Sequence, residues 1–281
     1  MDQFFLQNIK VLSENYPGLN TQNYQDFINQ YQKKHNLGFF INDESIANLK
    51  ECLLAGIPFS YLLKSHYFYN HEMYIDESVL IPRFETEILV FEALEFIKNC
   101  SLNEVSIADV CTGSGCIINA IQIESDKNLK GIAVDLDVNA LKIAKYNNFL
   151  IGHLKNKKHN IEFSQSDRLS SYQEQKFNLI LSNPPYIKES QRDTTVHKNV
   201  HTYEPHIALY LGDEIYMDWF DLFFTQAYNC LFDGGIFLME GDSNHLEFLA
   251  NILDESKSLN VSLKLKKDLA GRTRYLEFKK G

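Results

Sequence analysis

A short apolar run at residues 177–182 ends directly at the four residues Asn183, Pro184, Pro185 and Tyr186. A run of this length and composition is typical of a buried parallel strand. Neither proline can donate a hydrogen bond to a sheet, and each restricts the residue before it. The chain must therefore leave this strand in a rigid loop at its carboxyl end, the edge at which open α/β sheets bind their ligands.

The groups of this loop suit a planar NH2 group, such as an amide or a nucleobase amine. Asn183 offers a side-chain carbonyl, the prolines offer backbone carbonyls, and Tyr186 offers an aromatic face. We expect Asn183, Pro184 and Tyr186 to take part in catalysis and, together with Pro185, to bind the substrate. The alternative is a Pro-Pro turn that only closes a strand.

The chain alternates strand-like and helix-like segments from about residue 86 onward, which predicts a mainly parallel sheet with helices on both faces. The last two strands are separated by residues 268–272, too few for a helical crossover, so they should pair antiparallel. The fold class is α/β, with seven strands expected at residues 106–110, 131–135, 160–164, 177–182, 235–240, 261–266 and 273–278.

Residues 1–65 predict a small domain made only of helices. One helix is expected from Thr21, as its cap, to residues 36–38, because its apolar residues recur with helical spacing. A second is expected to begin at Asp43 or Ser45 and to stop before Gly56 and Pro58.

Residues 66–85 predict a linker that contains a β-hairpin. Two aromatic-rich segments, 67–69 and 73–75, flank a polar stretch at 70–72, which we expect to be the turn. The third domain is then residues 86–281.

Composition narrows the cellular setting and the partners. With 27 Lys and Arg against 37 Asp and Glu the net charge is −10, which repels phosphate backbones, so a long nucleic acid is not expected as a partner. No apolar run is long enough to span a bilayer and the start lacks a basic segment, so we expect a cytoplasmic protein without membrane attachment. The five cysteines contain no Cys-x-x-Cys pair, so neither disulfides nor a metal site is expected.

A glycine-containing loop, Cys111-Thr112-Gly113-Ser114-Gly115, follows the strand at 106–110 and precedes an apolar helix. Its glycines let a ligand approach the backbone, and its amides favour a polar or anionic group. A dinucleotide fingerprint would have glycine in place of Cys111 and a third glycine after Gly115. All five loop residues are therefore expected to bind a cofactor, but not a pyrophosphate.

Polar residues follow the next strands in turn. Asp135 ends the second strand, where a carboxylate can accept both ribose hydroxyls. Asp167 and Arg168 follow the third strand, where groups that flank an adenine ring belong, and Asn183 follows the fourth. Taken singly, Asp135 could be a surface acid and Asp167 a helix cap. Together they predict a nucleoside bound without a pyrophosphate, which indicates S-adenosylmethionine.

With the loops at Cys111–Gly115 and Asn183–Tyr186, the chain resembles the class I S-adenosylmethionine-dependent methyltransferases. Within them it resembles the protein-(glutamine-N5) methyltransferases that modify peptide chain release factors. Further matching segments are residues 79–87, Tyr203–His206 with Ala208 and Leu209, and Gly234–Gly235 leading to Glu240. The resemblance implies methylation of the glutamine in the Gly-Gly-Gln loop of the release factor. It also implies a helical domain that docks the release factor, a hairpin linker, a seven-stranded catalytic domain, and substrate contacts by Arg83 and Glu85.

The chain departs from the family pattern at a few positions. Phe84 stands where proline is usual, and Arg168 where an aromatic side chain commonly flanks the adenine, which puts the adenine contact in doubt. Asp242 and His245 replace the usual glycine and glutamine.

Two other functions stay open. A DNA methyltransferase acting on an exocyclic amine of adenine or cytosine shares the Asn-Pro-Pro-Tyr loop and must flip its base, although the acidic charge disfavours it. A catalytically silent methyltransferase-like adaptor is disfavoured by the intact Asn183 and Asp135. A nicotinamide dehydrogenase is weaker still, because its fingerprint is broken at Cys111.

Overall fold

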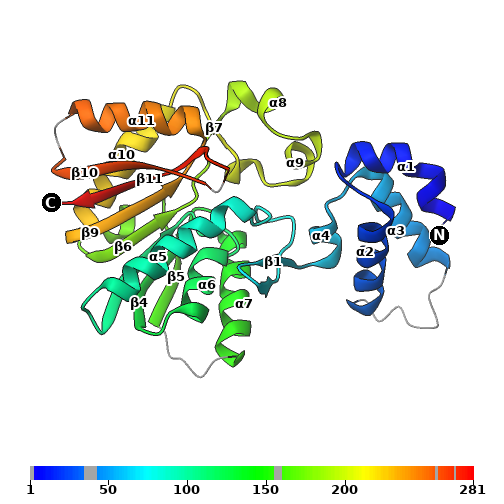
Figure 1. Ribbon diagram of the computed structural model, residues 1–281, viewed down its shortest axis with the longest axis horizontal. Coiled ribbons are helices and arrows are strands. Elements are labelled where there is room, and N and C mark those ends of the chain that lie inside the picture. Colours follow the sequence, from blue (N-terminus) through cyan, green and yellow to red (C-terminus); the bar gives the residue numbers. More distant parts are fainter. Residues whose placement is uncertain (1–2, 35–42, 155–159, 257–258, 269) are drawn as a thin grey trace.

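The computed structural model describes residues 3–34, 43–154, 160–256, 259–268 and 270–281. Two parts are visible in Figure 1, a small helical part that holds the N-terminus and a larger α/β part. The connection between them runs through a short helix and a β-hairpin.

The helical part builds its own apolar core. It comprises α1 (Gln3–Asn15), α2 (Thr21–Lys34), α3 (Asp43–Ala55) and α4 (Phe59–Leu63). Six buried side chains form this core: Phe5, Leu12, Tyr24, Phe27, Leu49 and Leu53.

The helices expected in this region are confirmed, but the cap of α2 was assigned wrongly. The side-chain oxygen of Asn20, and not that of Thr21, accepts the backbone N–H groups of Gln22 and Asn23, at 2.9 and 3.0 Å. An amide oxygen one residue before the helix reaches the N–H groups of the first turn, as an N-cap must. The expected end of α2 at residues 36–38 lies outside the described residues.

The linker hairpin is present with a different turn. Strands β1 (His66–Phe68) and β2 (His71–Met73) pair antiparallel. The turn consists of Tyr69 and Asn70, whose φ angles are 50° and 62°. Two central residues with positive φ match the twist of a tight hairpin, so the expected turn at 70–72 was wrong and two of its residues belong to β2.

All seven expected strands are confirmed in one sheet, in the order β10-β11-β9-β6-β3-β4-β5. Strand β11 runs antiparallel to both neighbours, and the other neighbouring pairs are parallel. The strands are β3 (Glu104–Val110), β4 (Asn128–Asp135), β5 (Asn160–Gln165), β6 (Phe177–Ser182), β9 (Leu231–Glu240), β10 (Val261–Lys267) and β11 (Thr273–Lys280).

Helices cover both faces of the sheet, as Figure 1 shows. Helices α5 (Glu87–Asn99), α6 (Cys116–Glu124) and α7 (Val138–Leu154) share one apolar cluster, and α10 (Tyr216–Cys230) and α11 (Ser243–Ser256) share another. Strand β3 contributes alternate residues to the two clusters, as the period of a strand requires. The predicted α/β architecture with its helical N-terminal part is confirmed.

A long excursion separates β6 from α10 and crosses the carboxyl edge of the sheet. Its two-residue strands β7 (Ile187–Lys188) and β8 (Tyr210–Leu211) pair in parallel. The strand order reverses between β3 and β6, and such a switch point opens a crevice for a ligand. Short helices complete the description: η1 (Phe84–Thr86), η2 (Ser170–Tyr172), η3 (Glu189–Gln191), α8 (Arg192–Thr195), α9 (Lys198–Tyr203) and η4 (His206–Ala208).

Gly131 in β4 is expected to be indispensable for folding. Its φ is +153°, and a Cβ built there would lie 1.7 Å from the backbone oxygen of Ile107 on β3. Gly131→Ala should therefore lower the free energy of unfolding by about 3 kcal/mol. Gly152→Ala, where the built Cβ meets nothing within 4 Å, is the matched control. Equal urea midpoints for the two variants would contradict this expectation.

Candidate active site

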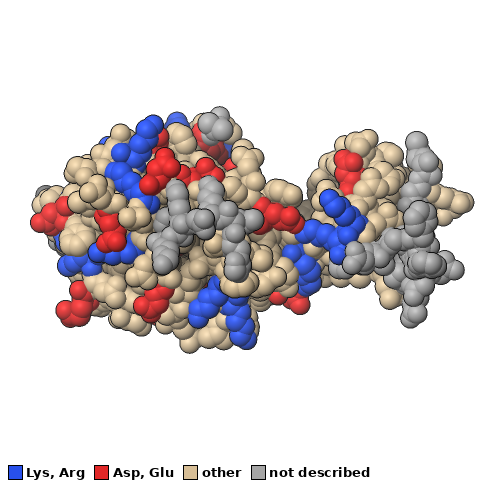
Figure 2. Space-filling model, turned by 90° about the horizontal axis from the view of Figure 1, so that it is seen from below, with Lys and Arg blue, Asp and Glu red and all other residues tan. Residues whose placement is uncertain are grey.

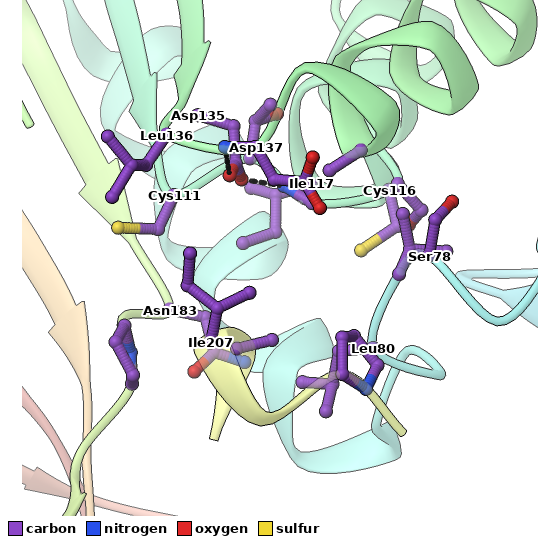
Figure 3. A pocket seen from close by; sticks show the side chains of 18 of the residues that line it. Ser78, Leu80, Cys111, Cys116, Ile117, Asp135, Leu136, Asp137, Asn183 and Ile207 are labelled. Carbon is purple, nitrogen blue, oxygen red and sulfur yellow. Dashed lines mark hydrogen bonds between the residues drawn. The ribbon is translucent and has the colours of Figure 1, made fainter. Parts of the chain in front are cut away.

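Asn183 leaves β6 half-buried, and its side chain is fixed from behind. Its Nδ2 donates a hydrogen bond to Oγ1 of Thr86, at 3.1 Å, and Thr86 itself is buried at the start of α5. Figure 3 shows Asn183 among the side chains that surround a pocket at the carboxyl edge of the sheet. Pro185 also lines this cavity, whereas Pro184 is buried and does not.

The cavity collects most of the residues singled out in the sequence. It encloses about 1050 Å³, including its open mouth. Four strand ends, those of β3, β4, β5 and β6, contribute to its wall. The predicted residues that line it are Cys111, Thr112, Gly113, Ser114, Asp135, Asp167, Arg168, Asn183 and Pro185.

The two glycines of the loop after β3 differ in their surroundings. Gly113 has φ +53°, and nothing lies within 4 Å of a Cβ built on it, so a ligand can approach the backbone there. Gly115 does not line the cavity. A Cβ built on it would lie 3.0 Å from the Cβ of Ala144, so this glycine allows α6 to pack closely against α7.

Asp135, at the end of β4, is hydrogen-bonded directly to this loop. Its two carboxylate oxygens accept the backbone N–H groups of Gly113 and Asp137, at 2.8 and 2.9 Å, as the dashed lines in Figure 3 show. Burial raises the pKa of this carboxyl, and the two N–H groups oppose that shift by stabilising its charged form. Because each carboxylate oxygen can accept a second hydrogen bond, Asp135 can still receive hydroxyl groups of a ligand.

Arg168 is buried in the cavity wall against Trp219, a residue that the sequence analysis missed. Its guanidinium carbon lies 4.8 Å from the centre of the indole ring, and Nη1 donates to the backbone oxygen of Trp219, at 2.8 Å. Nε and Nη2 both donate to the carboxylate of the exposed Asp167. An aromatic ring from α10 therefore lines the cavity beside Arg168. The only signal was that Trp219 is the sole tryptophan of the chain.

Tyr186 and the substrate-contact candidates Arg83 and Glu85 are not among the lining residues. The Tyr186 ring packs against apolar side chains, and its backbone oxygen accepts hydrogen bonds from Tyr216 and His245, at 3.1 and 2.8 Å. His245, a departure from the family pattern, therefore holds the loop after the two prolines.

Arg83 and Glu85 form ion pairs around the cavity. Nη2 of Arg83 lies 2.6 Å from Oε1 of Glu204, whose other oxygen accepts the N–H of Ile81, at 3.0 Å. This pair ties the linker to the excursion after β6. Glu85 lies 3.7 Å from Arg272.

Two further segments complete the wall, and neither was assigned to the site from the sequence. The linker contributes Ser78, Val79, Leu80 and Pro82, and the excursion contributes residues from Pro205 to Leu211. Both fall within or beside segments that matched the family pattern, which was the available signal.

The described residues include no group of three or more His, Cys, Asp or Glu side chains placed to hold a metal ion. All five cysteines are free thiols. No helix in the described ranges is long and apolar enough to cross a membrane.

Comparison with known proteins gives the family. The model of the methyltransferase small domain matches residues 89–206. A release factor glutamine methyltransferase of Leptospira interrogans is 38% identical over 220 residues, which cover 78% of this chain and 73% of that protein. The enzyme of the same description from Thermodesulfovibrio yellowstonii is 32% identical over 236 residues, with 84% and 81% covered.

Among solved structures, the catalytic domain of hMettl16 in complex with a hairpin of the MAT2A 3′UTR superposes with a TM-score of 0.53. It is 13% identical and 73% of each chain is covered, so this likeness concerns the fold alone. The family assignment rests on the sequence relatives. The chain is a methyltransferase and belongs to the family of release factor glutamine methyltransferases.

Proposed function

We propose that this methyltransferase methylates, in the cytoplasm, the side-chain nitrogen of the glutamine in the Gly-Gly-Gln loop of peptide chain release factors. The proposed methyl donor is S-adenosylmethionine, which supplies an electrophilic methyl group on a sulfonium when bound. The observation that carries the proposal is the shared cavity, in which the Asn183 loop faces Asp135 and Gly113. The family relatives support the choice of substrate.

The donor set of the cavity fits such a cofactor. We assign Asp135 to the ribose hydroxyls, because its carboxylate is anchored by two backbone N–H groups and keeps free acceptor capacity. The loop Cys111–Ser114 offers backbone groups beside the open space at Gly113. Asp167, Arg168 and Trp219 form a polar and aromatic wall suited to a purine ring.

The substrate end of the cavity has to orient a weak nucleophile. A carboxamide nitrogen is poorly nucleophilic because its lone pair is delocalised into the carbonyl. In our proposal, Oδ1 of Asn183 and the backbone oxygen of Pro184 each accept one N–H of the glutamine, which fixes the direction of attack. The methyl group would pass from the sulfonium, which would leave as a neutral thioether, to the nitrogen, and one N–H proton would then be lost to solvent. Tyr186 braces the loop from the core side.

The helical part is proposed to recognise the release factor. The described residues of this part, 3–34 and 43–65, contribute nothing to the cavity wall, and helix α1 exposes Leu6, Ile9 and Val11 on its surface. Arg83 and Glu85 lie on the linker between this part and the cavity, where they are proposed to contact the substrate at the rim.

Charge argues against the DNA methyltransferase alternative. The net charge is −10, and the first 75 residues carry five Lys against seven Asp and Glu. On the face drawn in Figure 2, basic and acidic side chains are interspersed and form no continuous basic stripe. A protein that tracks phosphates needs such a stripe.

Label transfer separates the two substrates. The purified chain is incubated with methyl-labelled S-adenosylmethionine and either a purified release factor or duplex DNA. We expect label in the release factor and none in DNA. Label in DNA alone would contradict the proposed function, and label in neither would favour the silent adaptor.

Removing the Asp135 carboxylate is expected to weaken cofactor binding. Asp135→Ala should lower the affinity for S-adenosylmethionine by roughly 1.5–3 kcal/mol, the scale of a lost hydrogen bond to a charged group. Asp221→Ala, on the exposed side of α10, removes the same charge elsewhere and should leave the affinity unchanged. Isothermal titration calorimetry measures both, and parental affinity in Asp135→Ala would remove this residue from the site.

A further inference from the structure

Two buried polar residues lie directly behind Asn183, on segments far apart in the sequence. Thr86 ends η1, and Glu240 ends β9, the strand beside β6. Each side chain belongs to a residue that is only 1% exposed. Nδ2 of Asn183 donates to Thr86 Oγ1, at 3.1 Å, and the Glu240 carboxyl lies near the Thr86 hydroxyl, which favours its charged form.

Apolar packing alone does not account for the carboxyl group at position 240. Its second oxygen, Oε2, is buried and has no hydrogen-bond partner among the described residues. Burial raises the pKa of Glu240 to about 7, while the Thr86 hydrogen bond and the nearby Arg274 and Arg83 favour its charged form and Glu85 opposes it. A buried, incompletely paired acid destabilises a fold, so its presence beside the active site indicates a functional role.

The direction of this hydrogen-bond chain decides which atom of Asn183 faces the cavity. In its charged form Glu240 can only accept, so the single hydrogen of the nearby Thr86 hydroxyl points to it. Thr86 Oγ1 can then only accept from Asn183, which places Nδ2 toward Thr86 and Oδ1 toward the substrate. A reversed amide would point its own NH2 at the NH2 of the glutamine, where two donors meet.

We propose that Thr86 and Glu240 are positioning residues that orient the Asn183 amide, so that its oxygen and not its nitrogen meets the substrate. This inference rests on the proposed role of Asn183. Neither residue touches the reacting atoms in this account, because both act through the amide.

The test begins with Thr86→Val, which keeps the shape of the side chain and removes the hydroxyl. With the amide no longer oriented, kcat should fall about ten- to a hundredfold, the scale of a misplaced catalytic group. KM for the release factor and the affinity for S-adenosylmethionine should stay within about twofold of the parent. Thr86→Ser, which restores the hydroxyl, should recover most of the rate.

Glu240→Met provides a second variant. It should lower kcat without lowering the melting temperature, because it removes a buried charge.

A double-mutant cycle separates this inference from the amide clamp on which it rests. The clamp is the pair of hydrogen bonds that Oδ1 of Asn183 and the backbone oxygen of Pro184 are proposed to accept from the glutamine. If Thr86 acts only through Asn183, the variant carrying both Thr86→Val and Asn183→Ala should be no slower than Asn183→Ala alone. Additive losses would show that Thr86 acts by another route and would overturn the inference. A parental rate in Thr86→Val beside a slow Asn183→Ala would also overturn it and leave the clamp intact. A parental rate in Asn183→Ala itself would reject the clamp and the positioning role together.

Discussion

Asn183→Ala is expected to slow methylation of the release factor by on the order of a hundred- to a thousandfold at saturating cofactor, the usual loss for one oriented catalytic hydrogen bond. The loss should appear in kcat, because Oδ1 aims the glutamine nitrogen and contributes little to docking of the whole protein. Stability should change little, since the half-buried side chain makes one hydrogen bond, to Thr86. Single-turnover kinetics and the melting temperature measure the two effects.

Asn139→Ala is the matched control for this variant. Asn139 lies on α7, close to the Asp135–Asp137 wall, but its exposed side chain only accepts a hydrogen bond from Lys142. The control should keep the parental rate. An Asn183→Ala variant that methylates within about fivefold of the parent would mean that another group accepts the hydrogen bond from the glutamine N–H.

Removing the N-terminal helices is expected to abolish methylation of an intact release factor while sparing the cofactor site. The cut should follow Gly56 and not residue 65, because Tyr61 packs with Ile75 and Val79 of the linker and donates to the backbone oxygen of Val79, at 2.7 Å. Without α1 to α3 the release factor loses its proposed docking surface. Methylation should then fail, because contacts remote from the reacting atoms position a large substrate.

Two readouts distinguish lost recognition from lost folding. Affinity for S-adenosylmethionine should stay near that of the parent, since the cavity wall begins at Ser78. A short peptide containing Gly-Gly-Gln should be methylated equally slowly by both proteins, because it lacks the part of the release factor that is proposed to dock on the helices. Full activity of the truncated chain on the intact release factor would place recognition elsewhere.

The helical part also touches the catalytic part at α9, which fixes their mutual placement. Asn199 donates to the backbone oxygen of Asn15, at 2.6 Å, and Tyr203 donates to that of Ala55, at 2.6 Å. Helix α9 belongs to the excursion that follows the Asn183 loop and leads to the wall residues near Pro205. Helix α9 therefore connects the helical part, which carries the proposed docking surface, to the excursion that begins at the Asn183 loop.

The strands and the residues proposed to bind the cofactor were predictable because their signals are local. A buried strand reads as a short apolar run, and a polar residue at its carboxyl end must lie at the ligand edge of a parallel sheet. Asp135 and Asn183 were found in this way, and both line the cavity. The linker hairpin was found for the same reason, although its turn was displaced by one residue.

The remaining features depend on contacts between distant segments. Gly113 and Gly115 look alike in the sequence, but only the packing of α6 against α7 shows that the second serves the fold. Trp219 joins the cavity wall because α10 carries it to Arg168. The link from Asn183 through Thr86 to Glu240 joins three segments, and no spacing in the sequence announces it.

Peptide mapping by mass spectrometry tests the central claim most directly. A purified, unmethylated release factor is incubated with the parent chain and S-adenosylmethionine, digested, and sequenced by fragmentation, with Asn183→Ala run in parallel. We expect one added methyl group on the side-chain nitrogen of the glutamine in the Gly-Gly-Gln loop, and far less of it with the variant. A methyl group on another residue, or equal modification by the two proteins, would contradict it.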